Sequence, residues 1–360
     1  MTRDGKIGIG IIGFGGIAQA AHAPGYRKVA DQCEIVAVAD IDPTRLEEAK
    51  SEKWGITQTF EDYKDLLALP EIDAVSVCTP NFVHLQPTLD AFAAGKHVLC
   101  EKPMAMNSDE AKQMIAAGEK AGKQLQIGYN LRFGSGPQSL KRAVAAGQFG
   151  EIYHARAQAI RRRGVPSWGV FTQKDKQGGG PLIDIGVHIT DMTLWLMGHP
   201  KPIAASGTAV TKFGTKEGVL GQMGQWDPKI YTVEDFATAY VRFDNGATYS
   251  LESSFIANIA KEEFSTHLFG TGAGAYLNAS TNQVTLYREE FGTLTDTTPG
   301  WLPSVPSSHG EEVKLFVKAV KEGLEVASLG AASGEQALMV TQIMDAIYKS
   351  SELGREVTIE

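Results

Sequence analysis

The strongest constraint on the fold is an apolar, isoleucine-rich run, IGIGII at residues 7–12, that leads directly into GFGGIA at residues 13–18. Short β-branched runs of this kind are typical of buried strands. The glycines have the spacing G-x-G-x-x-A, and a helix-like pattern follows them. A strand, a glycine-rich turn and a helix in this order begin a dinucleotide-binding βαβ unit. The motif alone is weak evidence, and the segments that follow it strengthen the interpretation.

Apolar strand-like segments alternate with amphipathic helix-like segments through the first 128 residues. The strand-like segments are residues 7–12, 34–40, 74–78, 97–100 and 125–128. The helix-like segments are residues 17–30, 43–54, 83–94 and 108–121. Pro24 is expected to break or kink the first of these helices. This alternation predicts an α/β domain with a parallel, doubly wound sheet.

The pattern changes after about residue 130, where strand-like segments follow one another. They are residues 152–160, 203–213, 236–243, 248–255, 264–270 and 275–287. Asn245-Gly246 predicts a tight hairpin between two of them. Residues 292–308 are rich in Thr, Pro, Ser and Gly and predict an exposed loop, and helical patterns follow at residues 311–323 and 335–351. We therefore predict a nucleotide-binding domain at residues 1–128 and an α+β domain with an open, mostly antiparallel sheet at residues 129–360.

Charge and composition exclude several classes of partner. The net charge of −8 argues against nucleic acid and anionic membranes as partners. The first apolar run, Ile7–Gly13, is too short to span a membrane, and no small-residue cleavage site follows it. The three cysteines are far apart in mostly apolar runs, which is typical of a reducing compartment, and no Cys/His cluster suggests zinc. We expect a cytoplasmic protein without a metal centre.

Residues of the glycine motif have distinct physical roles in nucleotide binding. Gly13 permits a tight turn, Gly15 lets a pyrophosphate approach the backbone, and Ala18 allows close helix–strand packing. The helix that follows presents free N–H groups to the phosphates. Asp40 ends the second strand, where an acid hydrogen-bonds a ribose 2′-hydroxyl and repels a 2′-phosphate. We therefore expect NAD rather than NADP, although Asp40 can also be an ordinary carboxylate at a strand end.

Three further segments have distinctive motifs: CTPNFVH (78–84), GKHVLCEKPMAM (95–106) and GGGPLIDIGVHITD (178–191). Together with the glycine motif, they resemble the Gfo/Idh/MocA family of glucose–fructose oxidoreductase, inositol dehydrogenase and rhizopine-catabolism proteins. EKP at a strand end and D-x-G-x-H on a later helix are specific only in combination. The resemblance covers nearly the whole chain. It implies a Rossmann domain, an open-sheet substrate domain, a nicotinamide cofactor, sugar or polyol substrates, and a cis bond between Lys102 and Pro103.

The residue types in these segments suit the oxidation of an alcohol. Asp184 and His188 are four residues apart, so on a helix they share one face. His188 can accept the hydroxyl proton while the substrate carbon loses hydride. Lys102 can hydrogen-bond the same oxygen and stabilise its developing negative charge, while Asp184 orients the site and holds the substrate. The alternative for Asp184 and His188 is an ordinary i,i+4 ion pair.

Further contacts are expected from segments that follow the strands. The expected cofactor contacts are Gly13, Phe14, Gly15, Gly16, Ile17, Ala18, Asp40, Thr79, Pro80, Asn81, His84, Glu101, Lys102, Asn130 and Trp168. The expected substrate contacts are Lys102, Arg163, Trp168, Asp184 and His188. Three of these residues have ordinary alternatives: Asn81 as a helix cap, Trp168 as a partly buried core aromatic and Arg163 as a solvated loop arginine. His22 and His309 are weaker candidates.

The sequence favours an enzyme that transfers a hydride between NAD(H) and a secondary hydroxyl of a cyclic sugar, sugar derivative or inositol. One alternative is a glycoside hydrolase that uses transient NAD-dependent oxidation. Another is a non-catalytic nucleotide sensor of the same fold, which would not need Lys102, Asp184 and His188 together. The open sheet suggests face-to-face pairing, so a homodimer or homotetramer is expected.

Overall fold

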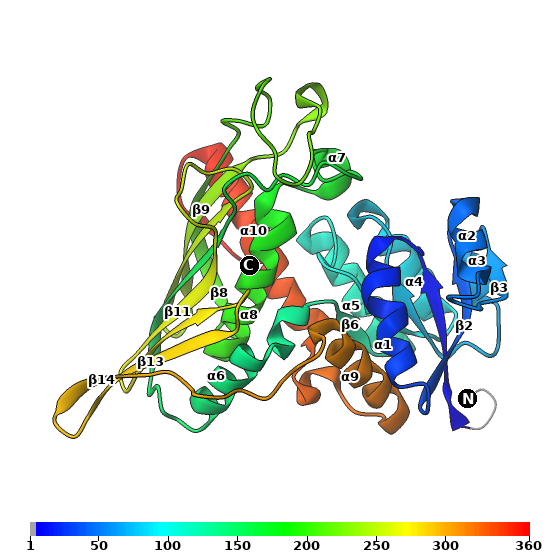
Figure 1. Cartoon of the computed structure of the whole chain (residues 1–360), viewed down its shortest axis with the longest axis horizontal. Helices are drawn as coiled ribbons and strands as arrows, with labels where there is room; N and C mark the ends of the chain where they lie inside the picture. The colour runs from blue at the N-terminus through cyan, green and yellow to red at the C-terminus, as the bar shows by residue number, and fades with distance from the viewer. Residues whose placement is uncertain (1–4) are drawn as a thin grey trace. The chain divides into compact units, whose positions relative to one another are not determined.

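The computed structural model describes residues 5–360, which form two compact units (Figure 1). The first unit comprises the chain up to Asn130 together with Pro306–Leu338, and the second comprises Leu131–Val305 and Met339–Glu360. The first domain was predicted at residues 1–128, so the prediction left out Pro306–Leu338, the later segment that belongs to the first unit. The two sheets confirm the fold class predicted from the sequence, a parallel α/β sheet and a mostly antiparallel sheet.

The first unit is built on a seven-stranded sheet in the order β15-β6-β5-β4-β1-β2-β3. Its strands are β1 (Ile7–Ile12), β2 (Cys33–Ala39), β3 (Gln58–Phe60), β4 (Ala74–Val77), β5 (His97–Cys100), β6 (Leu125–Ile127) and β15 (Ala332–Ser333). All are parallel except β15, which pairs antiparallel with β6. The strand order reverses at β1, which lies between β2 and β4. Ligands of doubly wound sheets bind beyond the carboxyl ends of the strands at such a point.

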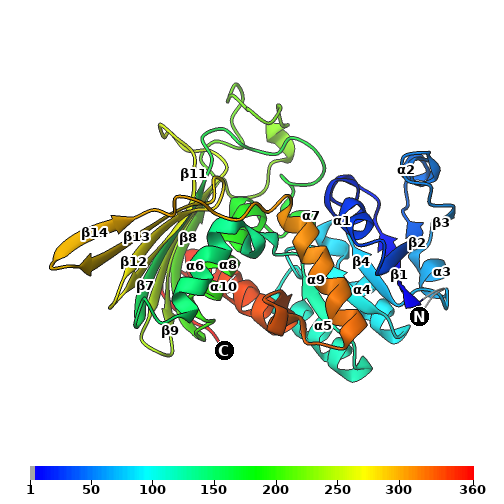
Figure 2. The same ribbon diagram turned by 60° about the horizontal axis from the view of Figure 1, so that its bottom comes forward.

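A late helix completes the core of the first unit. Helix α9 (Ser308–Glu322) lies beside α1 (Ala23–Lys28), as Figure 2 shows. Val313, Phe316 and Val317 of α9 are buried in the cluster that contains the inward side chains of β1. A π-helical turn, η2 (Ala18–His22), runs directly into α1, and Pro24 is the second residue of α1. The other helices are α2 (Pro43–Lys50), α3 (Tyr63–Leu67), α4 (Leu85–Ala93) and α5 (Ser108–Ala121).

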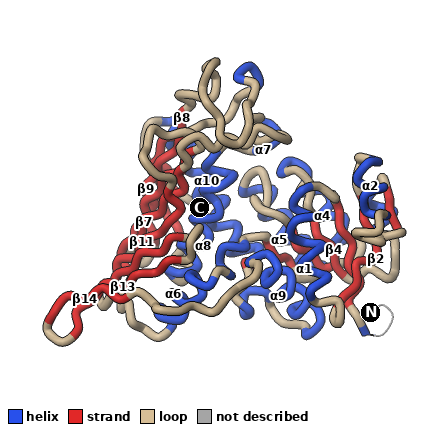
Figure 3. Tube along the Cα trace, in the orientation of Figure 1, coloured by secondary structure: helices blue, strands red, loops and turns tan. Residues whose placement is uncertain are grey.

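The second unit contains a nine-stranded sheet in the order β14-β13-β12-β11-β7-β10-β9-β8-β16 (Figure 3). Its strands are β7 (Ile152–Ile160), β8 (Pro202–Val210), β9 (Phe236–Phe243), β10 (Thr248–Ser254), β11 (Glu263–Gly270), β12 (Gly274–Asn278), β13 (Gln283–Glu290), β14 (Thr293–Thr297) and β16 (Val357–Thr358). The pairing of β10 with β7 is parallel, and the other pairings are antiparallel. Its helices include α6 (Ser135–Ala145), α7 (Lys174–Gln177) and α8 (Val187–Met197), and α8 packs on β7 and β11. Helix α10 (Gly334–Leu353) begins in the first unit and continues in the second.

Most predicted elements are confirmed, and several differ. The helix expected at residues 17–30 is the π-helical turn η2 followed by α1, and the helix expected at residues 43–54 ends at Lys50. The loop expected at residues 292–308 contains the edge strand β14, and the strand expected at residues 275–287 is the hairpin of β12 and β13. The helix expected to carry Asp184 begins with a π-helical turn, η5 (Leu182–Gly186), before α8. Within residues 5–360, no helix combines the length and the apolar character needed to cross a membrane.

Candidate active site

The glycine turn after β1 is held open by its neighbours in the first unit. Gly13 has a φ of 86°, and a Cβ at this position would lie 2.8 Å from the Cys78 carbonyl oxygen, so only glycine fits. Asp40, which follows β2, accepts a 2.6 Å hydrogen bond from the Phe14 N–H and a 2.9 Å bond from the Asp42 N–H. The carboxylate of Asp40 therefore braces the turn on which a nucleotide would rest.

Arg45 covers Gly15 from the side of α2. A Cβ at Gly15 would lie 2.6 Å from Arg45 Nη1, and the same nitrogen is 3.6 Å from Asp40 Oδ2. Next to it, Gly16 has no atom within 4 Å of a Cβ position, so the backbone there is open. Arg45 was not among the predicted residues, because an arginine in an exposed amphipathic helix carries no signal of its own.

A cavity of about 460 Å³ lies beside Asp40. Its walls are mostly apolar and include Ile41, Phe82 and Pro87, with Thr79 and Pro80 at the turn after β4. An apolar slot next to a carboxylate suits an adenine ring and its ribose. Together with the open backbone of the glycine turn, these residues fit an NAD molecule.

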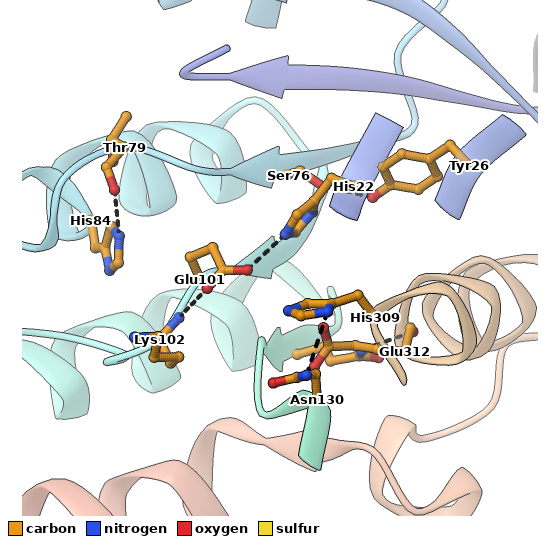
Figure 4. Close-up of polar contacts among 11 residues, drawn as sticks. His22, Tyr26, Ser76, Thr79, His84, Glu101, Lys102, Asn130, His309 and Glu312 are labelled. Carbon is orange, nitrogen blue, oxygen red and sulfur yellow. Dashed lines mark hydrogen bonds and ion pairs between the residues drawn. The ribbon is translucent and has the colours of Figure 1, made fainter. Parts of the chain in front are cut away.

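His84 was expected to contact the cofactor, but the structure uses both of its ring nitrogens internally. Nδ1 lies 2.8 Å from the Pro103 carbonyl oxygen and Nε2 lies 2.9 Å from that of Thr79 (Figure 4). The ring is fully buried, and this burial lowers the pKa of His84. His84 thus joins the turns that follow β4 and β5. It also directly precedes α4, and Asn81 lies in the 3₁₀ turn η3 (Asn81–Val83) that leads into this helix.

Lys102 lies in a turn after β5 that is fixed by its neighbour Glu101. The bond between Lys102 and Pro103 is cis, as the resemblance implied. One oxygen of Glu101 lies 2.8 Å from His22 Nε2, and the other accepts a 3.1 Å bond from the Lys102 backbone N–H (Figure 4). Burial alone would raise the pKa of Glu101, but the hydrogen bond from His22 and the electrostatic influence of the neighbouring His22, Lys102 and His309 lower it to about 2.

Asn130 is held by the segment that returns to the first unit. Its side-chain nitrogen donates a 2.9 Å hydrogen bond to Ser308 Oγ and lies 3.4 Å from His309 Nδ1. Both partners belong to the first turn of α9, and burial lowers the pKa of His309. The sequence placed Asn130 after the last parallel strand, but could not indicate that α9 meets it there.

The second unit carries Asp184 and His188 in consecutive helical segments. Asp184 lies in the π-helical turn η5, and His188 lies in the first turn of α8. The Asp184 carboxylate is buried, and its Oδ2 lies 3.8 Å from Arg161 Nη1. Arg161 was not among the predicted residues, although it is the arginine of the Arg161–Arg163 run that pairs with Asp184.

The glycines before Asp184 are clamped by Glu234 and Tyr348. The Glu234 carboxylate accepts hydrogen bonds from the N–H groups of Gly180, at 3.0 Å, and Leu182, at 3.1 Å. It also accepts a 3.0 Å bond from the Tyr348 hydroxyl. A Cβ at Gly179 would clash with Tyr348, and one at Gly180 would clash with the Glu234 backbone. The glycine run therefore serves close packing, and burial raises the pKa of Glu234.

The two remaining substrate candidates lie in the loop after β7. The Arg163 guanidinium donates to the Ala257 carbonyl at 3.1 Å and to Asn258 Oδ1 at 2.7 Å, so these loop contacts occupy it. Arg163 is half-buried, and its contact with a substrate stays a prediction. Trp168 is 54% exposed and meets Phe171 edge-on at 6.0 Å, so the alternative of a partly buried core aromatic is wrong.

Comparison with known proteins agrees with this geometry. Residues 7–129 match the oxidoreductase family with an NAD-binding Rossmann fold, and residues 138–276 match the GFO/IDH/MocA C-terminal domain. The chain is 37% identical over 354 residues to D-glucoside 3-dehydrogenase of Escherichia coli (strain K12), which covers 98% of this chain and 97% of the relative. The chain belongs to the Gfo/Idh/MocA family.

Other Gfo/Idh/MocA members and solved structures match over the same length. Myo-inositol 2-dehydrogenase of Thermotoga maritima (strain ATCC 43589 / DSM 3109 / JCM 10099 / NBRC 100826 / MSB8) is 29% identical over 354 residues, covering 98% of each chain. The crystal structure of an oxidoreductase domain protein from Kribbella flavida superimposes with a TM-score of 0.86 at 26% identity, covering 99% of each chain. The first unit is thus an NAD-binding Rossmann domain, and the second is the family's C-terminal domain.

Proposed function

We propose that this protein is an NAD-dependent dehydrogenase that oxidises a secondary hydroxyl of a cyclic sugar, with a glucoside as the first substrate to test. The observation that carries the proposal is the turn after β5, where Glu101 fixes the backbone of Lys102 beyond the carboxyl edge of an NAD-binding sheet. The relatives support the substrate class, because their names are those of a D-glucoside dehydrogenase and a myo-inositol dehydrogenase. Both names describe oxidation of a ring hydroxyl.

We propose that the residues around the glycine turn hold the cofactor. The backbone of residues 13–18 would receive the pyrophosphate, and Asp40 would accept the ribose hydroxyls. The cavity beside Asp40, lined by Thr79 and Pro80, would take the adenine. When bound, NAD supplies the acceptor for the hydrogen and electron pair that leave the substrate carbon. Asn130 and Trp168 remain proposed contacts of the nicotinamide end.

In the proposed reaction, side chains of the protein manage the proton and the charge on the substrate oxygen. A ring nitrogen of His188 takes the hydroxyl proton as the C–H bond breaks. The Lys102 ammonium donates a hydrogen bond to the same oxygen and stabilises its growing negative charge. Asp184, paired with Arg161, accepts a hydrogen bond from a neighbouring hydroxyl and so orients the sugar ring. The proposal requires Lys102 and His188 to act on one substrate.

The test is a substrate panel of methyl and aryl glucosides, free pyranoses, anhydrosugars and inositols, each assayed with NAD. A glucoside dehydrogenase forms NADH and a keto-glucoside in equal amounts. Release of free alcohol from an aryl glucoside without NADH would identify a hydrolase that uses transient oxidation. NAD binding without turnover of any compound would favour the nucleotide sensor.

A further inference from the structure

Four buried side chains form a continuous hydrogen-bond chain that ends at the turn carrying Lys102. Tyr26 Oη lies 2.7 Å from Ser76 Oγ, and Ser76 Oγ lies 2.9 Å from His22 Nδ1. His22 Nε2 lies 2.8 Å from Glu101 Oε1 (Figure 4). The side chains come from α1, β4, η2 and the end of β5, and each is at most 6% exposed. Segments far apart in the sequence therefore converge on one carboxylate.

For a neutral His22 ring, the chemistry of the end members fixes the direction of every hydrogen bond in this chain. With its pKa lowered to about 2, Glu101 is a carboxylate at neutral pH and can only accept. His22 Nε2 therefore carries the hydrogen and donates. A neutral imidazole with Nε2–H accepts at Nδ1, so the Ser76 hydroxyl donates to His22. The Tyr26 hydroxyl then donates to Ser76, and every buried donor has an acceptor.

The opposite direction would leave one buried hydroxyl without an acceptor within the hydrogen-bond chain. If Nδ1 of His22 carried a hydrogen, Ser76 Oγ would accept it, and only one of the Ser76 and Tyr26 hydroxyls could then find an acceptor within the chain. Tyr26 Oη and Ser76 Oγ are hydrogen-bond partners at 2.7 Å, so the hydroxyl that lost its acceptor would need one from outside this chain of four side chains. A buried unsatisfied donor costs about 1–3 kcal/mol. Burial also raises the pKa of Tyr26 well above its ordinary value, so the phenol keeps its hydrogen.

We infer that His22 is a positioning residue, which Tyr26 and Ser76 lock in the Nε2–H tautomer so that it orients Glu101 beneath Lys102. With Oε1 held by His22, the other oxygen of Glu101 accepts the Lys102 backbone N–H at 3.1 Å. The turn is thereby tied to the interior of the Rossmann sheet rather than to solvent. The inference rests on the proposed function in one respect, because it takes the role of this turn to be directing the Lys102 ammonium group towards the substrate oxygen.

The first test needs no activity. Nitrogen-15 NMR of the histidine-labelled protein at pH 7.5, with His22 assigned by its loss in His22→Gln, reports which ring nitrogen bears hydrogen. The expected result is a neutral ring with Nε2–H. An Nδ1–H tautomer or a doubly protonated ring would overturn the inference. In Ser76→Ala, the donor to Nδ1 is gone, and the spectrum should shift towards a mixture of tautomers.

The second test separates positioning from simple packing. In His22→Gln the side-chain NH₂ can reach the place of Nε2 and still donate to Glu101, whereas the shorter His22→Asn cannot. We expect His22→Gln to keep kcat near the parent value. His22→Asn should lower kcat by roughly ten- to a hundredfold, as expected for a displaced catalytic group, with the NAD dissociation constant unchanged. Equal kcat values for the two variants would refute the positioning role.

The backbone amide signal of Lys102 distinguishes this inference from the proposed function. The chemical shift of this amide should change in His22→Asn and stay the same in His22→Gln, whether or not any sugar is oxidised. If the parent protein oxidises no sugar but the tautomer and the Lys102 amide behave as expected, the proposed function fails and the positioning role of His22 stands. If the protein is an active dehydrogenase but the Lys102 amide is the same in both variants, the positioning role fails alone.

Discussion

Replacing Glu234 tests whether one carboxylate holds the turn that leads into Asp184. Glu234→Ala removes the acceptor of three buried donors, the N–H groups of Gly180 and Leu182 and the Tyr348 hydroxyl. An unsatisfied buried donor costs about 1–3 kcal/mol. We use the lower end of this range. Burial raises the pKa of Glu234, so its buried charge is itself unfavourable, and removing that charge offsets part of the loss. We expect the free energy of unfolding to fall by about 3 kcal/mol, or about 1 kcal/mol for each donor.

Glu234→Gln gives an intermediate and more specific result. The amide oxygen can replace Oε1, which accepts from Leu182 and Tyr348, while the amide NH₂ would face the Gly180 N–H. One hydrogen bond of three is lost, so the expected loss is about 1 kcal/mol. Glu356→Gln is the matched control. Its carboxylate forms an exposed ion pair with Arg242 in the same unit, and such pairs contribute about 0–1 kcal/mol.

The assay combines urea unfolding, followed by circular dichroism, with steady-state kinetics. Stability should decrease in the order parent, Glu234→Gln, Glu234→Ala, and kcat should fall in the same order because the turn positions Asp184. The NAD dissociation constant should not change, since Glu234 belongs to the second unit. An alanine variant as stable as the control, or equal losses for alanine and glutamine, would refute the clamp.

The remaining predictions concern the first unit and the proposed catalytic groups. The kcat/KM for NAD should exceed that for NADP at least about tenfold, a difference of about 1.4 kcal/mol. Asp40→Ser should lower this ratio of kcat/KM values, and Asp42→Ser should leave it unchanged. An unchanged ratio in both variants would show that Asp40 does not face the ribose. Lys102→Ala and His188→Ala should each lower single-turnover hydride transfer by roughly a hundred- to ten-thousandfold, with the double variant costing less than the product; near-parent rates would place catalysis elsewhere. The lowered pKa of Glu101 predicts a stabilising contribution that is complete above pH 4.5 and is lost as the pH falls through about 2, so acid unfolding of Glu101→Gln should lack this component.

Strands with strong apolar patterns were predictable, and edge strands were not. Ile7–Ile12, His97–Cys100, Ile152–Ile160 and Phe236–Phe243 have the predicted bounds, because burial on one or both faces imposes their pattern. The edge strand β14 is mostly exposed, and its Thr-rich sequence resembles a loop. A strand of this kind is held by main-chain pairing with one neighbour, which leaves no hydrophobic signal in the sequence.

The sequence identified site residues that belong to local motifs but not those that meet across the fold. Gly13, Asp40 and Lys102 each stand in a motif with recognisable spacing. His22 reaches Glu101 across 79 positions, and Glu234 reaches Gly180 across 54, so spacing could not connect either pair. In the run Arg161–Arg163, loop geometry decides which guanidinium reaches Asp184, and the sequence does not contain that geometry. Arg163 was the predicted residue, whereas Arg161 pairs with Asp184 in the structure.

The return of residues 306–338 to the first unit affects the order in which the protein folds during synthesis. Phe316 and Val317 fill the core next to β1, and β15 forms one edge of the Rossmann sheet. A nascent chain that has passed Asn130 therefore has most of its nucleotide-binding unit but not the helix that covers it. At roughly 5–20 residues per second, the ribosome needs about 10 to 40 seconds to reach α9. During that interval the apolar surface awaiting α9 is available to chaperones, and residues 131–305 of the second unit are synthesised before the first can be completed.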